Sequence, residues 1–268
     1  MMTPSPWRLL ADGSAGVILT VAFEARRGDP GFAELAPHLT GYRVLEAVPP
    51  ATTVTEVTEP GAYIEPWLAG ALADGPPVVG VLGHCSAAPL AAQLAAAIRG
   101  SRAADPSLVT VDPVLVDSRI ARGEYRQAVG SLAAHLGPEE LATALAPVAA
   151  RDTEPATTGH ALLPVLTGLE DAYRTTLAAA CRTMPVPAAM QRQLADRFAA
   201  YLAFLAASSL SAVQPPAAAP LGSVVLSGTQ DAEYPADLLV GATTFPVDRS
   251  RLLADADVAA FVLKVLGR

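Results

Sequence analysis

Cysteine is scarce in this chain. The two cysteines of the sequence, Cys85 and Cys181, lie far apart. Two cysteines cannot build a disulfide framework, and their separation does not fit a set of metal ligands. We therefore expect a reducing, cytoplasmic environment, with no metal site and no cofactor.

Positive charge is also scarce. The 268 residues include 18 Lys and Arg against 26 Asp and Glu, a formal net charge of −8. This balance argues against a nucleic-acid partner, which would need a basic surface. Hydrophobic residues make up 51% and charged residues 16%, which excludes a disordered chain and indicates a globular one. The length allows one or two domains.

Long hydrophobic runs are missing as well. No window reaches the roughly 18 uninterrupted apolar residues that a membrane span needs. The first apolar run, Gly16–Phe23, is short and is not followed by a convincing cleavage site, so it reads as a core strand and not as a signal peptide. We expect no membrane partner.

Strand-like and helix-like segments alternate through the first half of the chain. Short apolar runs predict strands, and apolar residues at helical spacing between them predict helices. The predicted strands are Gly16–Phe23, Tyr42–Val48, Val78–Leu82 and Leu108–Val116, the last interrupted by Pro113. Their alternation with helices predicts a parallel sheet covered on both faces, with right-handed crossovers.

The middle of the chain changes character. From residue 120 to residue 211 the pattern is almost entirely helical, which predicts a helical lid inserted into a single α/β domain spanning 1–268. The predicted lid helices are Tyr125–Leu136, Glu139–Ala149, Leu169–Arg182 and Ala188–Leu210. Strand patterns return at Ser223–Leu226 and Leu238–Val240, and a helix over Val258–Leu266 closes the chain.

One motif is sharp. The sequence Gly83-His84-Cys85-Ser86-Ala87 follows a predicted strand and opens a predicted helix. It has the form Gly-x-nucleophile-x-small, which is the nucleophile elbow of α/β-hydrolases with cysteine in place of serine. Small residues are needed on both sides because the nucleophile sits on a sharp turn. A helix N-terminus would stabilise a thiolate, and the Ser86 N–H is placed to hold an oxyanion. The alternative is a buried structural cysteine.

The wider sequence resembles the thioesterase domains of polyketide and nonribosomal peptide assembly lines. The resemblance rests on segments on both sides of the elbow: Ile18–Pro50, Tyr63–Arg99, the strand ends Val111-Asp112 and Val116-Asp117, and the closing Leu252–Val258. It implies an α/β-hydrolase fold with a mostly parallel, doubly wound sheet and a helical lid. It also implies an acyl or peptidyl carrier protein, with a phosphopantetheine-bound substrate, as the partner. With a cysteine nucleophile, the chain resembles the tetramate- and pyridone-forming Dieckmann cyclases.

The sequence departs from this family at two places. The nucleophile is Cys85, and the closing histidine is missing, because Asp248-Arg249-Ser250-Arg251 stands in its position. A hydroxyl needs a base to become a nucleophile, whereas a thiol is already partly ionised near neutral pH. Water attack on an acyl-enzyme still needs a base. The two departures together predict acyl capture with poor hydrolysis. His160, in a predicted lid loop, is the one histidine that could swing over the site, and the alternative is a solvated loop residue.

Three aspartates are candidates for the acid of the site. Asp112 and Asp117 follow the strand after the elbow, and Asp231 follows Ser223–Leu226; each has the alternative of an ordinary turn aspartate. The second oxyanion donor is expected from the turn Phe23–Ala25, which includes Glu24. Arg249 is a candidate for holding a carboxylate, an enolate or a phosphopantetheine phosphate, or else is a surface arginine.

Three functions remain open at this stage. The first is an off-loading cyclase that passes a β-ketoacyl-aminoacyl chain from a carrier thiol to Cys85 and releases it by Dieckmann-type ring closure. The second is an acyl or aminoacyl shuttle between carrier proteins, with a type II editing thioesterase as a variant. The third is a non-catalytic scaffold that docks a carrier protein. Ser86 is a remote alternative nucleophile.

Overall fold

The computed structural model describes residues 5–23, 31–71, 76–101, 105–149, 155–184, 186–213, 222–229, 234–235, 239 and 241–267. The chain forms two compact units. We call them the sheet unit, which comprises Met1–Pro50, Pro60–Leu115 and Ser211–Arg268, and the helical unit, which comprises Ala51–Glu59 and Val116–Leu210.

The sheet unit is built on one seven-stranded sheet in the order β1-β3-β2-β4-β5-β6-β7. Its strands are β1 (Trp7–Ala11), β2 (Val17–Val21), β3 (Arg43–Ala47), β4 (Val78–His84), β5 (Ser107–Val111), β6 (Ser223–Ser227) and β7 (Thr243–Phe245). All neighbouring pairs are parallel except β1 and β3, which are antiparallel. The predicted mostly parallel sheet is confirmed.

The observed strands at the two edges of the sheet were not predicted. The edge strand β1 was not predicted, since its sequence WRLLA has one buried residue followed by exposed and half-buried ones and so lacks the alternation of a half-buried strand. The predicted strand Leu238–Val240 lies outside the described residues except for Leu239. Among the described residues, the strand that pairs with β6 at this edge is Thr243–Phe245.

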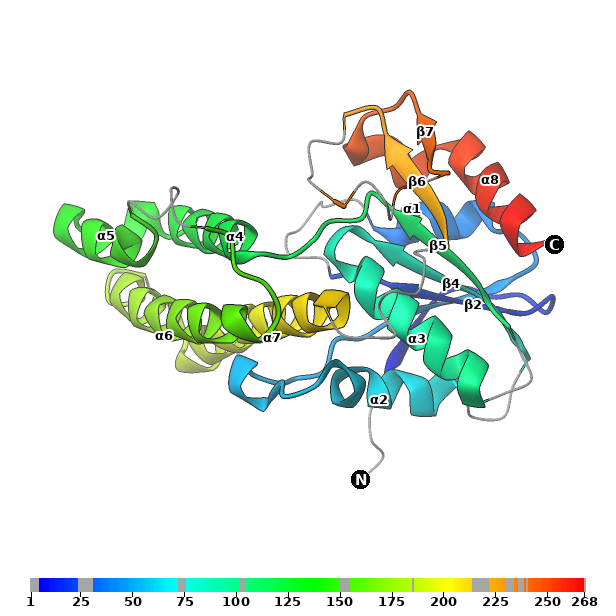
Figure 1. Cartoon of the computed structure of the whole chain (residues 1–268). Coiled ribbons are helices and arrows are strands. Elements are labelled where there is room, and N and C mark those ends of the chain that lie inside the picture. The colour runs from blue at the N-terminus through cyan, green and yellow to red at the C-terminus, as the bar shows by residue number, and fades with distance from the viewer. Residues whose placement is uncertain are drawn as a thin grey trace. The chain divides into compact units, whose positions relative to one another are not determined.

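Helices cover both faces of this sheet (Figure 1). On one face, α1 (Phe32–Leu35) and α8 (Ala256–Leu266) bury apolar residues against alternate residues of the central strands, including Val109 and Val111 of β5. The other face carries α3 (Ala88–Ser101), which packs on β4 and β5, and α2 (Pro60–Ala71), which packs on α3. The sheet is therefore doubly covered, as the run of fully buried residues in β2 requires.

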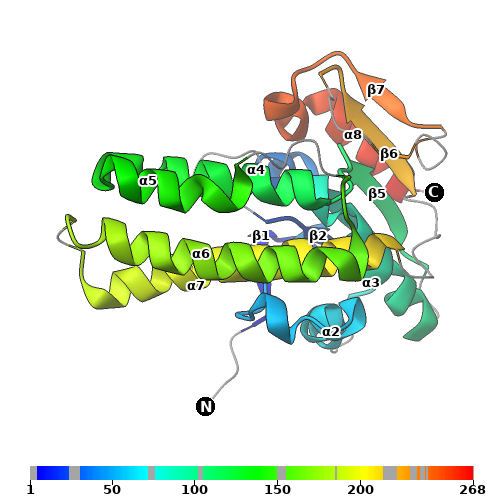
Figure 2. The same cartoon turned by 60° about the vertical axis from the view of Figure 1, so that its left-hand side comes forward.

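The helical unit contains α4 (Ser118–Gly130), α5 (Pro138–Leu145), α6 (Leu163–Ala180) and nearly all of α7 (Ala188–Val213), which lie alongside one another (Figure 2). Aromatic rings join them: the centroids of Tyr173 and Phe198 are 4.1 Å apart, and those of Tyr125 and Phe198 are 6.4 Å apart. The first lid helix starts at Ser118 and not at the predicted Tyr125, because the carboxylate of Asp117 caps it.

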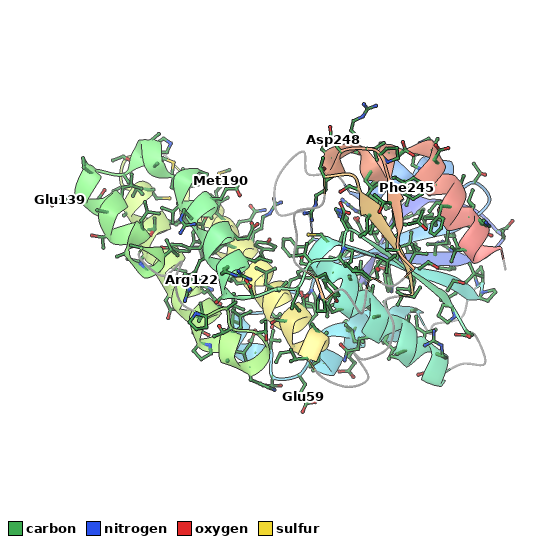
Figure 3. All side chains as sticks on the ribbon, turned by 45° about the horizontal axis from the view of Figure 1, so that its top comes forward. Glu59, Arg122, Glu139, Met190, Phe245 and Asp248 are labelled. Carbon is green, nitrogen blue, oxygen red and sulfur yellow. The ribbon has the colours of Figure 1, made fainter. Side chains whose placement is uncertain are left out.

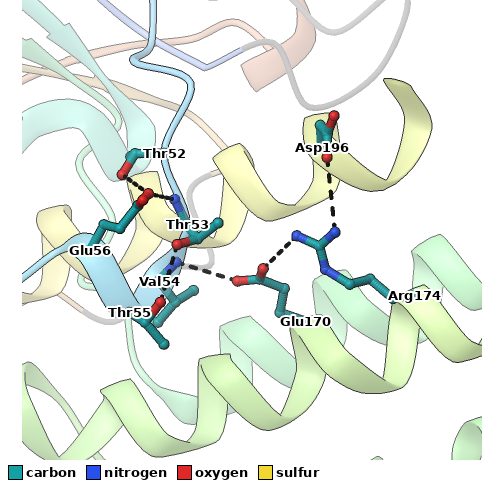
Figure 4. Close-up of polar contacts among 8 residues, drawn as sticks. All are labelled: Thr52, Thr53, Val54, Thr55, Glu56, Glu170, Arg174 and Asp196. Atoms are coloured by element: carbon teal, nitrogen blue, oxygen red, sulfur yellow. Dashed lines mark hydrogen bonds and ion pairs between the residues drawn. The ribbon is translucent and has the colours of Figure 1, made fainter. Parts of the chain in front are cut away.

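The segment Ala51–Glu59, which links β3 to α2 in sequence, belongs to the helical unit. Figure 4 shows why: the Val54 N–H donates to the buried carboxylate of Glu170 in α6 over 3.3 Å. The same carboxylate accepts from Arg174 at 2.8 Å, and Arg174 also lies 3.9 Å from Asp196 of α7. One glutamate thus fastens this segment to the inserted helices. In the described part of the chain, no helix is both long enough and apolar enough to span a membrane.

Candidate active site

Cys85 occupies a sharp turn between a strand and a helix. Strand β4 ends at His84, a short 3-10 helix covers Cys85–Ala87, and α3 follows from Ala88. The backbone of Cys85 has φ +56°, a left-handed conformation that is rare for a residue with a side chain. Such a conformation costs on the order of 1–3 kcal/mol and is typical of functional sites. The turn holds a half-exposed thiol at the start of a helix.

The residues around this turn are small for a steric reason. A Cβ atom on Gly83 would lie 2.6 Å from the Cβ of Ala91 and 3.0 Å from the Cα of Ala88. Ala87, two residues after Cys85, is completely buried. The turn therefore brings α3 so close to β4 that no side chain fits at position 83.

Arg249 lies next to the thiol. Its Nη2 donates to Cys85 Sγ over 2.7 Å. Arg249 begins the 3-10 helix η8 (Arg249–Ala254), which follows the segment marked by Phe245 and Asp248 in Figure 3. Strand β7 pairs in parallel with β6, and beyond it the Gly228 N–H donates to Val247 O. The backbone N–H of Arg249 donates to Thr229 Oγ1 over 3.2 Å, which ties Arg249 to the residues that follow β6. A guanidinium thus stands beside the sulfur at the position where the resemblance places a histidine.

Asp112 completes the group. It follows β5, has φ +42° and is fully buried. Its carboxylate accepts two hydrogen bonds of 2.7 Å from Ser227, one from the backbone N–H and one from the hydroxyl. Its Oδ2 lies 3.9 Å from Arg249 Nε, which is an ion-pair distance but too long for a hydrogen bond. The structure therefore brings Cys85, Arg249 and Asp112 into one row.

Ser227 is the residue of this site that sequence reasoning missed. It ends β6, and a serine at a strand end gives no signal of its own in the sequence. Its partner becomes visible only because β5 and β6 pair in parallel, so that both strands end at the same edge of the sheet. Ser227 fixes the carboxylate that faces Arg249.

The imidazole of His84 lies beneath the turn. Its ring meets the ring of Phe32 edge-on at 6.2 Å, and its Nε2 is buried without a hydrogen-bond partner among the described residues. Burial, and secondly the positive charge of Arg249, lower the pKa of His84 to about 4. His84 is therefore neutral at pH 7, and Arg249 carries the positive charge of the site.

The other predicted site residues fall elsewhere. Ser86 is half-buried in the 3-10 helix Cys85–Ala87, directly after Cys85. Asp117 belongs to the helical unit, where its carboxylate accepts from Arg119 N–H at 2.8 Å and from Ile120 N–H at 2.9 Å. His160 is exposed in the 3-10 helix Gly159–Leu162 of the same unit. Glu24 and Asp231 lie outside the described residues.

The chemistry of the row follows from its residue types. A guanidinium stays protonated at any pH that a protein survives, so Arg249 can stabilise a thiolate but cannot accept a proton. Across the part of the chain that the structure describes, no three His, Cys, Asp or Glu side chains are grouped so that they could hold a metal ion. The arrangement is suited to a sulfur nucleophile, Cys85, whose thiolate form is stabilised by the positive charge of Arg249. The buried carboxylate of Asp112 lies on the other side of Arg249.

Comparison with known proteins informs the fold. No protein-family model matches the sequence, and no curated protein does. Among solved structures, a four-domain nonribosomal peptide synthetase bound to AMP and glycine is similar over 98% of this chain and 20% of its own, with 16% identity and a TM-score of 0.51. The Vlm2 thioesterase domain bound to a dodecadepsipeptide covers 97% of this chain and 96% of its own, with 18% identity and a TM-score of 0.49. The surfactin thioesterase domain covers 98% and 96%, with 11% identity and a TM-score of 0.46.

The structural similarity to the synthetase agrees with the order and direction of the strands in this chain. The chain has a mostly parallel sheet with one antiparallel edge strand, and a strained turn leads from its central strand β4 into a helix. These are the features of the α/β-hydrolase fold. The chain has that fold, with a helical unit inserted after β5.

Proposed function

We propose that the protein takes an acyl group from a carrier-protein thioester onto Cys85 and releases it to a nucleophile other than water. The release that fits best is an intramolecular, Dieckmann-type ring closure in the biosynthesis of a polyketide or nonribosomal peptide. The observation that carries the proposal is the 2.7 Å contact between Arg249 Nη2 and Cys85 Sγ, at the position where a hydrolase needs a base.

Acyl capture uses the stabilised sulfur. The positive charge of Arg249 and the start of the helix both favour the thiolate over the thiol. In this step the thiolate attacks the thioester carbonyl, the carbonyl carbon bonds to Cys85 Sγ, and the bond to the carrier sulfur breaks. The carrier thiolate leaves and takes a proton from solvent. We assign the Ser86 N–H as one donor to the oxyanion. Of the turn Phe23–Ala25, which is expected to supply the second donor, only Phe23 is among the described residues.

Release to water is disfavoured by the same contact. Hydrolysis of an acyl-enzyme needs a group that removes a proton from water, and such a base contributes about 10²–10⁴-fold to the rate. Arg249 cannot accept that proton, and Asp112 is buried with both oxygens bound by Ser227. A carbon flanked by two carbonyl groups is acidic enough to need only a weak base, so attack by such a carbon of the acyl chain itself does not depend on the missing histidine. The released product is then a ring.

Intact-protein mass spectrometry tests this proposal. The protein is incubated with a β-ketoacyl-aminoacyl pantetheine thioester, and the small-molecule products are analysed in the same reaction. We expect an adduct on the wild type and none on Cys85→Ala, together with a ring product and little free acid. Cys181→Ala is the matched control, because it removes the other free cysteine, which lies in the helical unit. It should behave as the wild type does.

Each other outcome points to a different function. An adduct that persists until a second holo-carrier protein is added, and then moves to it, would replace ring closure by acyl shuttling. Free acid as the main product would contradict the role given to Arg249. A panel of thioesters that leaves no adduct on Cys85 would favour a non-catalytic carrier-docking scaffold.

A further inference from the structure

Among the described residues, the guanidinium of Arg249 has one acceptor within hydrogen-bond distance. Its shortest contact among the described residues is the 2.7 Å bond to Cys85 Sγ, whereas the carboxylate of Asp112 stays 3.9 Å from Nε. Asp112 cannot move closer without breaking its two 2.7 Å bonds to Ser227. The Arg249 side chain is 37% exposed, so its remaining N–H groups can reach a bound molecule.

Acylation of Cys85 removes that acceptor. With a thiolate, the row carries one positive charge and two negative charges. When the sulfur becomes part of a thioester, one negative charge is lost, and the half-buried Nη2 loses its anionic partner. The neutral His84 does not compensate, and the fixed position of Asp112 prevents it from taking over the contact. In the acyl-enzyme, the nearest anion to the guanidinium among the described residues is then Asp112, which lies 3.9 Å from Nε and is too far away for a hydrogen bond. Nη2 is left without its short contact at the place where the acyl chain is attached.

We infer that Arg249 exchanges partners during the reaction: it holds the Cys85 thiolate in the free enzyme and a planar, two-oxygen anion of the acyl chain in the acyl-enzyme. The inference rests on the proposed acyl transfer and names its substrate class. The site selects acyl chains that carry such an anion close to the thioester, because a planar guanidinium pairs with two coplanar oxygens through parallel hydrogen bonds. Two sources supply this chemistry, a carboxylate and the enolate of a 1,3-dicarbonyl group.

A competition between acyl groups of equal shape tests the inference. N-acetylcysteamine thioesters of malonyl and of acetoacetyl groups are each mixed in equal amounts with deuterium-labelled 3-methylbutanoyl thioester, a neutral group of the same size. The ratio of adducts on Cys85 at equilibrium is read from the intact protein mass. Because both groups compete for the same sulfur, the ratio does not depend on how much thiolate is present.

We expect the anionic group to be favoured about tenfold in the wild type, as for a hydrogen bond to a charged group. The preference should fall to about one in Arg249→Gln. Arg251→Gln removes an exposed arginine two residues away and is the matched control; it should keep the wild-type ratio. A preference for malonyl alone identifies a carboxylate as the natural anion, and a preference for acetoacetyl identifies an enolate. A ratio of one in the wild type, or an equal preference in Arg249→Gln, would overturn the inference while leaving acyl transfer intact.

A second measurement does not depend on acylation. In Cys85→Ala the sulfur is absent, so Arg249 should bind the monomethyl malonate anion, and calorimetry should detect it. The Cys85→Ala/Arg249→Gln double variant should bind it at least tenfold more weakly. Equal binding by the two variants would contradict the exchange. If no thioester acylates the wild type but Cys85→Ala binds the anion through Arg249, the proposed transfer fails and the anion site stands.

Discussion

The helical unit and the Cys85 site of the sheet unit use arginine in different ways. In the helical unit, arginines sit against carboxylates: Arg174 Nη2 is 2.8 Å from Glu170, and Arg119 Nε is 3.0 Å from Asp117. Arg8 and Arg99 of the sheet unit likewise pair with Glu46 and Asp105. At the Cys85 site, however, Arg249 lies 3.9 Å from the carboxylate of Asp112 and makes its short bond to the sulfur of Cys85. The first arrangement holds helices and a connecting segment in place. The second leaves a cation whose shortest contact is with the sulfur of Cys85, the nucleophile proposed above. The first kind of arginine has a structural role, and the second is proposed to have a chemical one.

The strongest test of this difference is to replace Arg249 by a residue that can act as a general base. Arg249→His places an imidazole between Cys85 and Asp112, and an imidazole can take a proton from water. We expect hydrolysis of a preformed acyl-Cys85 to accelerate about a hundredfold or more. The release of free acid over time measures it, with Arg251→His as the control. An acyl-enzyme that forms on Arg249→His and hydrolyses no faster would show that the missing base is not what limits hydrolysis.

The pH dependence of stability sharpens the comparison. The unfolded chain protonates His84 near pH 6.5, whereas the folded chain does so only near a pKa of about 4. The unfolded state therefore binds more protons between these values, so the free energy of unfolding is highest above pH 6.5 and falls as the pH drops toward 4. The loss is on the order of 3 kcal/mol.

Urea unfolding at pH 7 and at pH 4 measures this loss. Both tryptophans, Trp7 and Trp67, lie in the sheet unit, so their fluorescence reports on its unfolding, while far-ultraviolet circular dichroism also follows the helical unit. His84→Gln should remove the part of the pH dependence that comes from this residue. An identical profile in His84→Gln would mean that other groups account for it.

The next largest expected effect is the loss of stability on substituting Gly83, the glycine two residues before Cys85. Gly83→Ala puts a Cβ 2.6 Å from that of Ala91, and neither the strand nor the helix can yield easily. We expect a loss of about 2 kcal/mol in the free energy of unfolding of the sheet unit. Tryptophan fluorescence during urea unfolding checks it. Unchanged stability would mean that α3 can shift away from β4.

A smaller effect is expected on the rate at which Cys85 is alkylated. Arg249→Gln should slow alkylation of Cys85 by iodoacetamide at pH 7 about tenfold and raise the pH at which the rate is half-maximal, because the thiolate loses its cation. Arg174→Gln removes an arginine of the helical unit and should leave alkylation unchanged. The alkylation rate against pH, followed by mass spectrometry in a Cys181→Ala background, measures both. Equal slowing in the two variants would erase the distinction between the two kinds of arginine.

The smallest expected effect lies in the helical unit. Gly168 is exposed inside α6, and a Cβ there would meet no atom within 4 Å. Gly168→Ala should therefore stabilise this helix by about 1 kcal/mol, since alanine has the higher helix propensity. The midpoint of urea unfolding followed by circular dichroism should rise, in contrast to Gly83→Ala. A fall would indicate that the glycine has a packing role.

Local features of the sequence predicted much of the fold. Apolar runs and helical spacing located β2 to β6 and the main helices, and the small residues around Cys85 predicted a turn that the structure contains. The edge strand β1 was missed since only Trp7 of its five residues is buried. The start of α4 was placed too late because the cap by Asp117 acts outside the apolar pattern.

The grouping of Cys85, Arg249 and Asp112 could not be predicted from the sequence, because it results from contacts between segments that are far apart in the chain. The sequence marked Cys85, Asp112 and Arg249 separately. It favoured Asp112 as the acid, because this residue ends a strand just before Pro113, and offered Asp117 and Asp231 as alternatives. What joins the first three is the pairing of β5, β6 and β7, which no local pattern encodes. Ser227 shows the same limit: its bond to Asp112 spans 115 positions of the chain.

The bond between Val54 and Glu170 bears on how such an insertion is inherited or exchanged. Because Ala51–Glu59 folds with Val116–Leu210, the chain passes between the two units four times. A recombination event, or an engineer, that transfers only the long insertion would leave the buried Glu170 carboxylate facing a foreign segment. The helical unit is therefore made of two separate chain segments. A graft of this unit into another protein with the α/β-hydrolase fold would have to carry the short segment before α2 together with the helices.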